Sequence, residues 1–564
     1  MATARQRVFR LGLIAAAALI LYLPGLGRPP LWEPDEGRYA EIAREMYLSH
    51  DYVTPRDDFV RYFEKPPLVY WSEAAAISIF GAHEFAIRLP AALFSVAQVV
   101  VTAALAEVMF GDAVAILAAI ALALSPLFFG FARFATLDPA LAFFMTAAMA
   151  AFYMSARKRD FGEGDGHRWF WLSAAMLALG TLAKGPVAPL LCGSIALIWI
   201  LVEGRAREIS RIPWISSIAI YGAITIPWFA LAAYRNPGFL EFFFIHEHFH
   251  RYLVETEHGW GPWFFIPIVI GGAWPWIFFV PLGLRDADSV EAVSHRSKLR
   301  FLMIWFAVIF VFFSIPRAKL GSYVLPAMPA LAILAGAGMA SLWTLDRNSS
   351  RRICALFASL NLLIAIAAAI ALFAARDRMP FELADDTYLI AGLLGATAIV
   401  SFTLNRDGTR PGVFAMVLAL GMILIAGTAA RARRHLDVFA SYRNLAGQVS
   451  SNLHPGCILA SYRHDVHSLP FYTGFREALV SYRGELAPFG DSPDAAASFI
   501  DNDEALRKLW ASEKCFVLIA NRKDLATLDT LTPTPAIIGC EGKKFALSNA
   551  RDAHRAVDCR SEHL

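Results

Sequence analysis

The sequence predicts a polytopic α-helical membrane protein whose C-terminal tail forms a small α/β domain outside the membrane. Of its 564 residues, 57% are hydrophobic and only 18% are charged, whereas soluble globular chains average about 25% charged residues. The apolar residues are gathered in blocks of transmembrane length, and the charged residues return after about residue 431. This distribution excludes an ordinary soluble enzyme, and a net charge of +3 gives no support for nucleic-acid binding.

The apolar blocks define the expected transmembrane helices. A helix needs about 20 apolar residues to cross the hydrocarbon core. Two shorter stretches, 169–183 and 301–316, become plausible spans if their flanking residues snorkel, which brings the expected count to 13. The longer blocks are 11–27, 89–106, 113–132, 139–156, 185–202, 212–234, 259–284, 320–345, 353–375, 387–405 and 411–430.

The charges of the loops predict the orientation of the chain. Lys and Arg favour the cytoplasmic side of a membrane. If the arginine-rich N-terminus is cytoplasmic, the inside loops at 157–168, 203–211 and 285–300 are all basic. An odd number of spans then places the tail outside. We expect the first block to be a retained helix, because no small-residue cleavage site follows it.

We therefore expect a transmembrane domain at 1–430 and an outer α/β domain at 431–564. The first outer loop, 27–87, is expected to carry two interfacial helices. One begins near Pro34. The other, 68–82, is too short to span the bilayer and contains a glutamate, so it is expected to lie in the outer interface or to be re-entrant.

The first of these helices is expected to be amphipathic. Tyr39, Ile42 and Met46 fall on one face at helical spacing, and Glu41 and Arg44 fall on the other. Acidic residues in its first turn also complement the helix dipole, which by itself is a sufficient reason for their presence.

The tail is expected to contain a helix at 503–513 and a strand at 515–520. Two of the six cysteines lie in spans and are expected to pack there. An oxidising compartment would permit two disulfides in the tail, in any of three pairings. The tail cysteines are Cys457, Cys515, Cys540 and Cys559.

Charged side chains gather in the outer loops and are almost absent from the spans. A transporter is expected to hide ionisable residues inside its helices. Here they lie in the loops 28–67, 133–138, 235–258 and 315–323, so the function is expected at the outer membrane surface.

Several of these side chains suit a lipid phosphate. Lys65 can reach the headgroup level, although snorkelling alone would also place it there. Arg251 can bind phosphate oxygens bidentately, and Tyr323 can donate from its hydroxyl. Lys319 lies outside against the positive-inside bias, which favours a use beyond topology. Asp138, at the outer end of a span, could pair with the nearby Arg133 or act in a site.

A histidine-rich outer segment raises the possibility of a metal. His246, Glu247 and His250 match the H-E-x-x-H pattern of zinc proteases, which also needs a third ligand. Glu257 or His258 could serve by type, but not at a metzincin spacing. A metal held by Glu64 and one of these histidines is the alternative.

Taken together, these motifs occur in one order along residues 10–330. They are Pro34-Asp35-Glu36 with Arg38-Tyr39-Ala40-Glu41, Tyr62-Phe63-Glu64-Lys65-Pro66-Pro67, Asp138, Lys184-Gly185-Pro186, His246-Glu247-His248 leading to Arg251-Tyr252, and Lys319 with Tyr323-Val324-Leu325-Pro326. The set resembles the bacterial lipid-linked sugar transferases of the aminoarabinose transferase type, which are related to protein O-mannosyltransferases and have the GT-C fold. The chain departs from that pattern at Gly37 and Gly321, where the family commonly has proline.

The resemblance implies an inverting glycosyltransferase of the bacterial inner membrane, with a cytoplasmic N-terminus and a periplasmic tail. Its donor would be a sugar on a polyprenyl phosphate, and its acceptor lipid A or another envelope molecule. The sugar would be aminoarabinose or a relative such as galacturonic acid or a neutral hexose. We expect a monomer that does not bind nucleic acid. A flippase for the polyprenyl sugar and a membrane zinc protease are the alternative functions.

The resemblance also implies roles for particular residues. Asp35, Glu36 and Asp138 are the expected catalytic acids. The expected substrate- and phosphate-binding residues are Lys65, Arg251, Tyr323, Lys319, Arg38 and Tyr62. Glu64 and His246 are the expected ligands of a divalent metal, with zinc favoured by the histidine.

Overall fold

The chain divides into two compact units. The computed structural model describes residues 4–160, 162–250, 259–285, 292–375, 381–512 and 514–550. The first unit comprises Met1–Pro24, Ala91–Ala230 and Leu240–His435, and the second comprises Gly25–Pro90, Leu231–Phe239 and Leu436–Leu564. The first outer loop, expected within the domain 1–430, is thus grouped with the tail.

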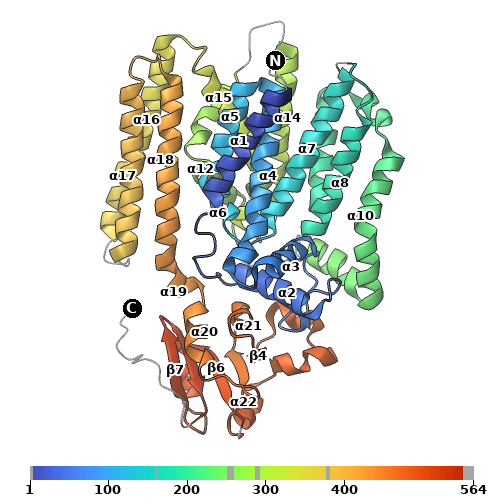
Figure 1. The fold of residues 1–564 in the computed structure, drawn as a ribbon, viewed down its shortest axis with the longest axis vertical. Coiled ribbons are helices and arrows are strands. Elements are labelled where there is room, and N and C mark those ends of the chain that lie inside the picture. The colour runs from blue at the N-terminus through green and yellow to red at the C-terminus, as the bar shows by residue number, and fades with distance from the viewer. Residues whose placement is uncertain are drawn as a thin grey trace. The chain divides into compact units, whose positions relative to one another are not determined.

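The first unit is built from long apolar helices (Figure 1). Two of the helices, α4 and α10, begin or end in segments of the second unit. The helices are α1 (Ala4–Tyr22), α4 (Glu84–Phe110), α5 (Asp112–Ala123), α6 (Pro126–Ala132), α7 (Asp138–Asp160), α8 (His167–Lys184), α9 (Val187–Val202), α10 (Trp214–Arg235), α12 (Phe265–Gly272), α13 (Val280–Gly283), α14 (Ala292–Ser314), α15 (Met328–Ser341), α16 (Arg347–Ala375), α17 (Phe381–Leu404) and α18 (Pro411–Ala432).

Each of the 13 predicted spans coincides with a helix or a bent pair of helices. Eight helices of the described chain are long and apolar enough to cross a membrane, or up to ten if each bent pair is one span. The pairs α5–α6 and α12–α13 bend by 67° and 95°. Pro126 begins α6 and supplies no amide hydrogen to the preceding turn. Because α1, α8 and the 16-residue α9 do not qualify, the count of 13 stays a prediction.

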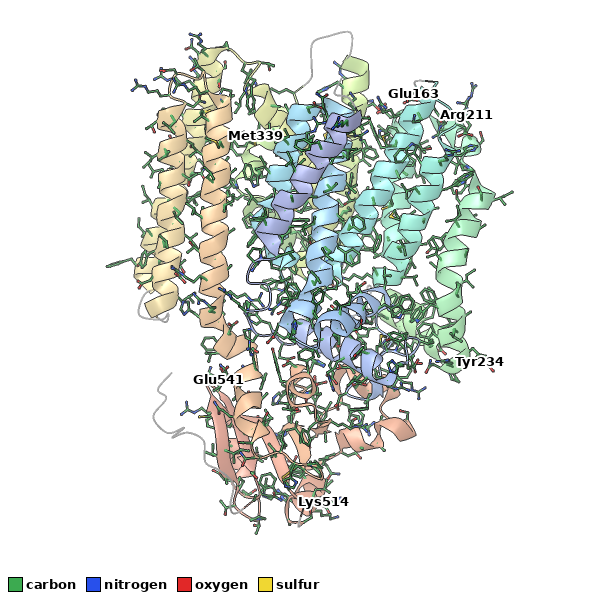
Figure 2. All side chains as sticks on the ribbon, in the orientation of Figure 1. Glu163, Arg211, Tyr234, Met339, Lys514 and Glu541 are labelled. Carbon is green, nitrogen blue, oxygen red and sulfur yellow. A yellow bond between two sulfur atoms is a disulfide. The ribbon has the colours of Figure 1, made fainter. Side chains whose placement is uncertain are left out.

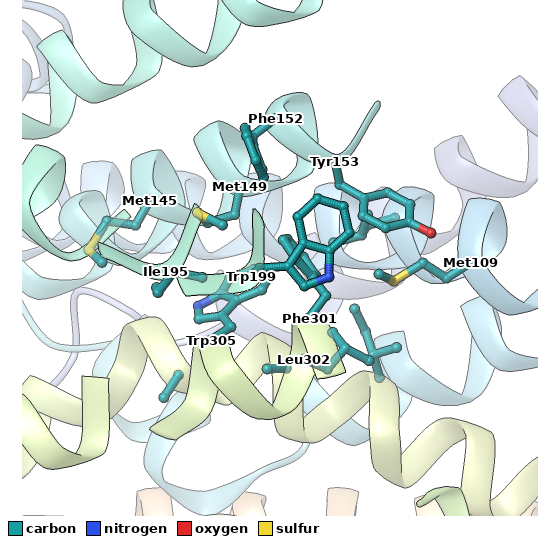
Figure 3. Packing of buried hydrophobic residues seen from close by; sticks show 14 of the residues in the cluster. Met109, Met145, Met149, Phe152, Tyr153, Ile195, Trp199, Phe301, Leu302 and Trp305 are labelled. Atoms are coloured by element: carbon teal, nitrogen blue, oxygen red, sulfur yellow. The ribbon is translucent and has the colours of Figure 1, made fainter. Parts of the chain in front are cut away.

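Large buried side chains fill the centre of the first unit (Figure 3). The rings of Phe152 and Trp199 are 5.9 Å apart, and those of Tyr153 and Phe301 are 5.2 Å apart. The indole N–H of Trp305 donates to the carbonyl of Pro326 at 2.9 Å, so this buried donor is satisfied. Apolar helices gain little from hydrophobic burial within lipid, so close packing of this kind holds them together.

The second unit contains a six-stranded mixed sheet with helices on both faces. Its strand order is β5-β4-β3-β6-β8-β7, with β3, β4, β5 and β6 parallel and β8 antiparallel to its neighbours. The tail strands and helices are β3 (Ile458–Tyr462), β4 (Glu477–Val480), β5 (Phe499–Ile500), β6 (Phe516–Asn521), β7 (Ala536–Glu541), β8 (Lys544–Ser548), α19 (Asp437–Ala440), α20 (Arg443–Ser450), α21 (Ser468–Thr473), α22 (Asp503–Trp510) and α23 (Leu525–Leu528).

Alternating residues of β6 supply the cores on the two faces of the sheet. Phe516 and Leu518 pack with Trp510 on one face, and Val517 and Ile519 pack with the α20 side on the other. The strand predicted at 515–520 is therefore β6, buried on both faces as expected for a parallel neighbour. The helix predicted at 503–513 is α22.

Two labelled residues lie at opposite ends of the strands of this sheet (Figure 2). Lys514 precedes β6 and Glu541 ends β7, and these two strands run in the same direction. Next to Lys514, Cys457 and Cys515 form a disulfide, which is one of the two expected in the tail. The other expected pair includes Cys559, which lies outside the described residues.

The outer-loop segment of the second unit forms α2 (Asp35–Ser49), the hairpin β1 (Arg56–Asp57) and β2 (Val60–Arg61), and α3 (Leu68–Phe80). The expectation of a helix with a solvated charged face is wrong for α2. Glu41 is fully buried and Glu45 is 6% exposed. Arg44 pairs with Glu41 at 2.6 Å, and the amide of Phe59 donates to Glu45 at 2.8 Å.

Candidate active site

Asp35 is the first residue of α2 and is half-buried. Its carboxylate forms no hydrogen bond or ion pair with any residue that the structure describes. The positive end of the helix dipole suits an acidic side chain at this place. Asp35 is therefore an available acid for binding or for proton transfer.

Glu36, the adjacent acid, forms a buried structural ion pair. Its carboxylate accepts hydrogen bonds from Nε of Arg88 at 2.6 Å and from Nη2 of Arg88 at 2.7 Å. Both side chains are fully buried. The amide of Trp32 donates to the same carboxylate at 3.1 Å. A catalytic role for Glu36 stays a prediction. Sequence reasoning missed Arg88, although an arginine directly before an apolar span was a usable signal.

Arg38 and Tyr62 lie together, buried within the second unit. Arg38 pairs with Glu485 at 2.8 Å and donates to the Tyr62 hydroxyl at 3.3 Å. Burial opposes the charge of Arg38, but Tyr62 and Glu485 outweigh it and the pKa of Arg38 is raised. Burial likewise raises the pKa of Tyr62. Because Glu485 already neutralises the guanidinium, phosphate binding by Arg38 and Tyr62 stays a prediction.

Glu64 and Lys65 precede α3, whose first turn follows Pro66 and Pro67. Lys65 Nζ donates to the Glu64 carbonyl at 3.2 Å and lies 3.7 Å from its carboxylate. Glu64 is 7% exposed, whereas Lys65 is half-buried. Lys65 thus remains accessible to a ligand next to a buried acid.

In the first unit, Asp138 and Lys184 form a pair at the ends of two neighbouring helices. Asp138 begins α7, Lys184 ends α8, and Lys184 Nζ lies 2.5 Å from the carboxylate. Each charge also suits its helix terminus. Arg133 instead donates to the carbonyls of Tyr22 and Pro24, so the local Arg133–Asp138 pair that we considered does not form.

Tyr323 joins this pair. Lys184 Nζ lies 4.7 Å from the centre of the Tyr323 ring, which is a favourable cation–π distance. The ring also packs on Phe313 at 5.1 Å. The structure therefore brings together two predicted site residues, Asp138 and Tyr323, through Lys184. Sequence reasoning quoted Lys184 in a motif but assigned it no function.

Lys319 is 3% exposed. Its ammonium donates to the carbonyls of Trp260, at 3.0 Å, and Pro316. Burial lowers the pKa of Lys319. These contacts use two of its three protons on backbone carbonyls, so a direct phosphate contact by Lys319 stays a prediction.

The histidine-rich segment continues the first unit after α10. His246 lies in a π-helical stretch, Glu241–His250, where it is exposed and stacks on Phe242 at 5.4 Å. Glu247 is buried. Arg251 lies outside the described residues, as do the third-ligand candidates. Glu64 belongs to the second unit and His246 to the first, so their metal pair stays a prediction.

The described groups supply the chemistry that transfer from a lipid phosphate requires. Lys65 and Lys184 provide positive charge, the Tyr323 hydroxyl can donate a hydrogen bond, and Asp35 is an acid without a partner among the described residues. Stabilising a leaving phosphate and orienting a nucleophile need these group types.

Comparison with known sequences identifies relatives. A family model described as dolichyl-phosphate-mannose-protein mannosyltransferase matches residues 8–243. The chain is 32% identical over 372 residues to undecaprenyl phosphate-α-4-amino-4-deoxy-L-arabinose arabinosyl transferase 2 of Pseudomonas fluorescens, covering 66% of this chain and 62% of that protein. It is 30% identical over 427 residues to the transferase of this name from Yersinia pestis, covering 74% and 75% of the two chains.

A solved structure matches nearly the whole chain. The crystal structure of ArnT from Cupriavidus metallidurans bound to undecaprenyl phosphate superposes with a TM-score of 0.81. The match covers 98% of this chain and 99% of that chain at 29% sequence identity. The similarity therefore extends beyond the 66% and 74% of the chain that the alignments with these two relatives cover.

Proposed function

This chain belongs to the family of undecaprenyl phosphate-α-4-amino-4-deoxy-L-arabinose arabinosyl transferases, and on that premise we propose that it is a membrane glycosyltransferase with a sugar donor on undecaprenyl phosphate. The single observation that carries the proposal is the structural match over 98% of the chain to a relative that binds undecaprenyl phosphate. The acceptor is lipid A or another molecule of the cell envelope.

The enzyme lies in the bacterial inner membrane with its N-terminus in the cytoplasm. We count 13 spans, three of which are short or interrupted by charge, and place the tail in the periplasm. The basic inside loops support this orientation. The disulfide Cys457–Cys515 also supports an oxidising compartment for the tail.

The reaction is a single displacement at the anomeric carbon. An acceptor oxygen forms the new bond to this carbon, while the bond from the carbon to the lipid phosphate oxygen breaks and its electron pair leaves with the phosphate. Inversion follows because attack and departure occur on opposite faces. Lys65, Arg251 and Tyr323 stabilise the charge that grows on the leaving phosphate. Lys184 orients Tyr323 and pairs with Asp138.

Asp35 serves the acceptor side. If the acceptor is a hydroxyl, Asp35 takes its proton as a general base. If the acceptor is a phosphate of lipid A, it is already ionised, and Asp35 orients the sugar or pairs with its amino group. A 4-amino-4-deoxyarabinose, a pentose, is the favoured sugar because of the named relatives, with galacturonic acid the main competitor.

The donor types of Glu64 and His246, a carboxylate and an imidazole, suit zinc. A zinc ion bound there would add positive charge for the leaving phosphate. Every step above uses only side chains of the chain, and the metal requirement is tested separately by transfer after chelation.

The proposal is tested with purified protein, radiolabelled undecaprenyl phosphate-aminoarabinose and lipid A. Asp35→Asn is expected to lower transfer without changing the melting temperature, by about 100-fold or more if Asp35 acts as a general base on a hydroxyl acceptor. Lys65→Met is expected to lower transfer because it removes a positive charge that stabilises the leaving phosphate. The control is Glu504→Gln, an exposed acid of α22 paired with Lys508. Normal transfer by both Asp35→Asn and Lys65→Met would overturn the mechanism, and mass spectrometry of the product identifies the sugar.

A further inference from the structure

A compact group of three metal-ligand side chains lies inside the second unit, and none of the three is a residue assigned to transfer. Asp57 ends β1, and Asp465 and His467 lie in the connection from β3 to α21. His467 Nδ1 is 2.8 Å from an oxygen of Asp57 and 3.5 Å from an oxygen of Asp465. One ligand atom of each residue lies within 4.8 Å of the others.

The spacing of these atoms fits a single metal ion. Two ligands at about 2.0–2.2 Å from zinc lie about 2.8–3.8 Å apart when the angle between them is 90–120°. The two measured separations, 2.8 and 3.5 Å, fall in this interval. The imidazole nitrogen favours a transition metal over Ca²⁺ or Mg²⁺, which prefer oxygen ligands alone.

The three side chains are shielded from water. Their exposed fractions are 1% for Asp57, 8% for His467 and 11% for Asp465. A hydrogen bond from His467 would satisfy one oxygen of Asp57. The other, Oδ1, is buried and has no hydrogen-bond partner among the described residues. A buried carboxylate oxygen without a partner is costly, and a cation would satisfy it.

The surroundings contain more buried acid than base. Asp58 accepts the amide of Glu477 at 2.9 Å, Glu477 accepts the amide of Val466 at 3.3 Å, and Glu33 accepts the amide of Ser468 at 2.8 Å. Each of these carboxylates also has one buried oxygen with no partner in the described part of the chain. The nearby Arg38 reaches His467 Nε2 only at 3.5 Å and pairs closely with Glu485. The cluster therefore contains more acidic than basic side chains.

We propose that Asp57, Asp465 and His467 bind a divalent transition-metal ion. The ion would join the β1–β2 hairpin to the connection between β3 and α21, two segments far apart in the sequence. Its role is structural, because it fixes the hairpin that follows α2. This site is separate from the predicted pair Glu64 and His246, so each can be removed without the other.

The test measures zinc bound to the full-length protein in detergent, after chelation and re-addition of Zn²⁺. Asp465→Asn and His467→Gln are each expected to bind about one equivalent less than the wild type, and to lose the rise in melting temperature on zinc addition. His454→Gln, which replaces an exposed histidine of the tail, is the matched control and is expected to keep this equivalent. Equal binding by the wild type, Asp465→Asn and His467→Gln would overturn the proposal.

A second variant guards against loss of folding. His467→Cys retains a zinc ligand and introduces a thiolate. When loaded with Co²⁺, this variant is expected to show a thiolate-to-cobalt absorption band in the near ultraviolet that the wild type lacks. A folded His467→Cys protein that takes up Co²⁺ without this band would show that residue 467 is not a ligand. Because the readouts are metal content and absorption, they do not depend on sugar transfer.

Discussion

The carboxylate of Glu36 and the guanidinium of Arg88 form a two-pronged ion pair that excludes solvent completely. Their oxygen–nitrogen distances are 2.6 and 2.7 Å. The remaining protons of Arg88 go to the carbonyls of Leu26, Pro29 and Pro30 at 2.6–3.1 Å. Arg88 therefore links the segment before α2 to the beginning of α4, and both belong to the second unit.

Removing Arg88 alone is expected to destabilise the protein strongly. Arg88→Met leaves the Glu36 charge buried without its partner, which costs about 3–5 kcal/mol of unfolding free energy. Thermal unfolding in detergent measures the loss. The control is Lys508→Met, which breaks an exposed pair and is expected to cost less than about 1 kcal/mol. The double variant Glu36→Leu/Arg88→Met should recover part of the loss, and a wild-type melting temperature for Arg88→Met would contradict this account.

Gly37 is expected to tolerate no side chain. A β-carbon there would lie 2.7 Å from Glu33 Oε1 and 2.8 Å from the amide of Ser468, which are hydrogen-bonded to each other. Gly37→Ala is expected to cost about 1–3 kcal/mol from overpacking, despite the helix preference of alanine. Gly447→Ala in α20, where nothing lies within 4 Å, is the control and should be neutral or stabilising. Equal melting temperatures for the two variants would disprove the close contact.

The disulfide Cys457–Cys515 is expected to stabilise the tail. It closes a loop with a sequence separation of 58 residues, for which chain entropy alone predicts about 4 kcal/mol. The double variant Cys457→Ala/Cys515→Ala should unfold at lower temperature, as followed by limited proteolysis of the tail. Cys192→Ala in the buried core of the first unit is a control for cysteine removal without loss of a bridge. Unchanged protease resistance of the double variant would argue against the bridge.

Substitutions of Lys184 and of Tyr323 are expected to differ in their effects on thermal stability and on the rate of sugar transfer. Lys184→Met removes the partner of Asp138 and should lower both the melting temperature and the transfer rate. Tyr323→Phe keeps the ring beneath Lys184, so stability should stay unchanged. Loss of the hydroxyl donor should lower transfer about tenfold, which corresponds to about 1.4 kcal/mol of transition-state stabilisation. Full activity of Tyr323→Phe would remove the hydroxyl from the mechanism.

The sequence predicted those parts of the fold that depend on local composition. The positions of the apolar helices followed from blocks of apolar residues, because the bilayer requires a fixed length of them. The strand β6 and the helix α22 followed from short apolar runs and helical spacing. The breaks at α5–α6 and α12–α13 were missed, because a bent pair has the same composition as a straight span.

The parts that the sequence could not predict depend on partners far along the chain. Arg38 of α2 reads as solvated because its partners Glu485 and His467 lie more than 400 positions away. The buried oxygens around Asp57 are invisible for the same reason. At the candidate site, the types of Asp35, Lys65 and Tyr323 were recognisable from motifs. The ion pairs Glu36–Arg88 and Asp138–Lys184 could be identified only from the fold.

The second unit is made of segments that the ribosome produces at very different times. Residues 25–90 are synthesised early, whereas Leu436–Leu564 come last. Until then Glu33, Arg38 and Asp57 lack the partners that the tail supplies. Residues 25–90 therefore stay incompletely folded while the helices of the first unit are inserted into the membrane. Folding of the second unit is therefore completed only after the segment that begins at Leu436 has been synthesised.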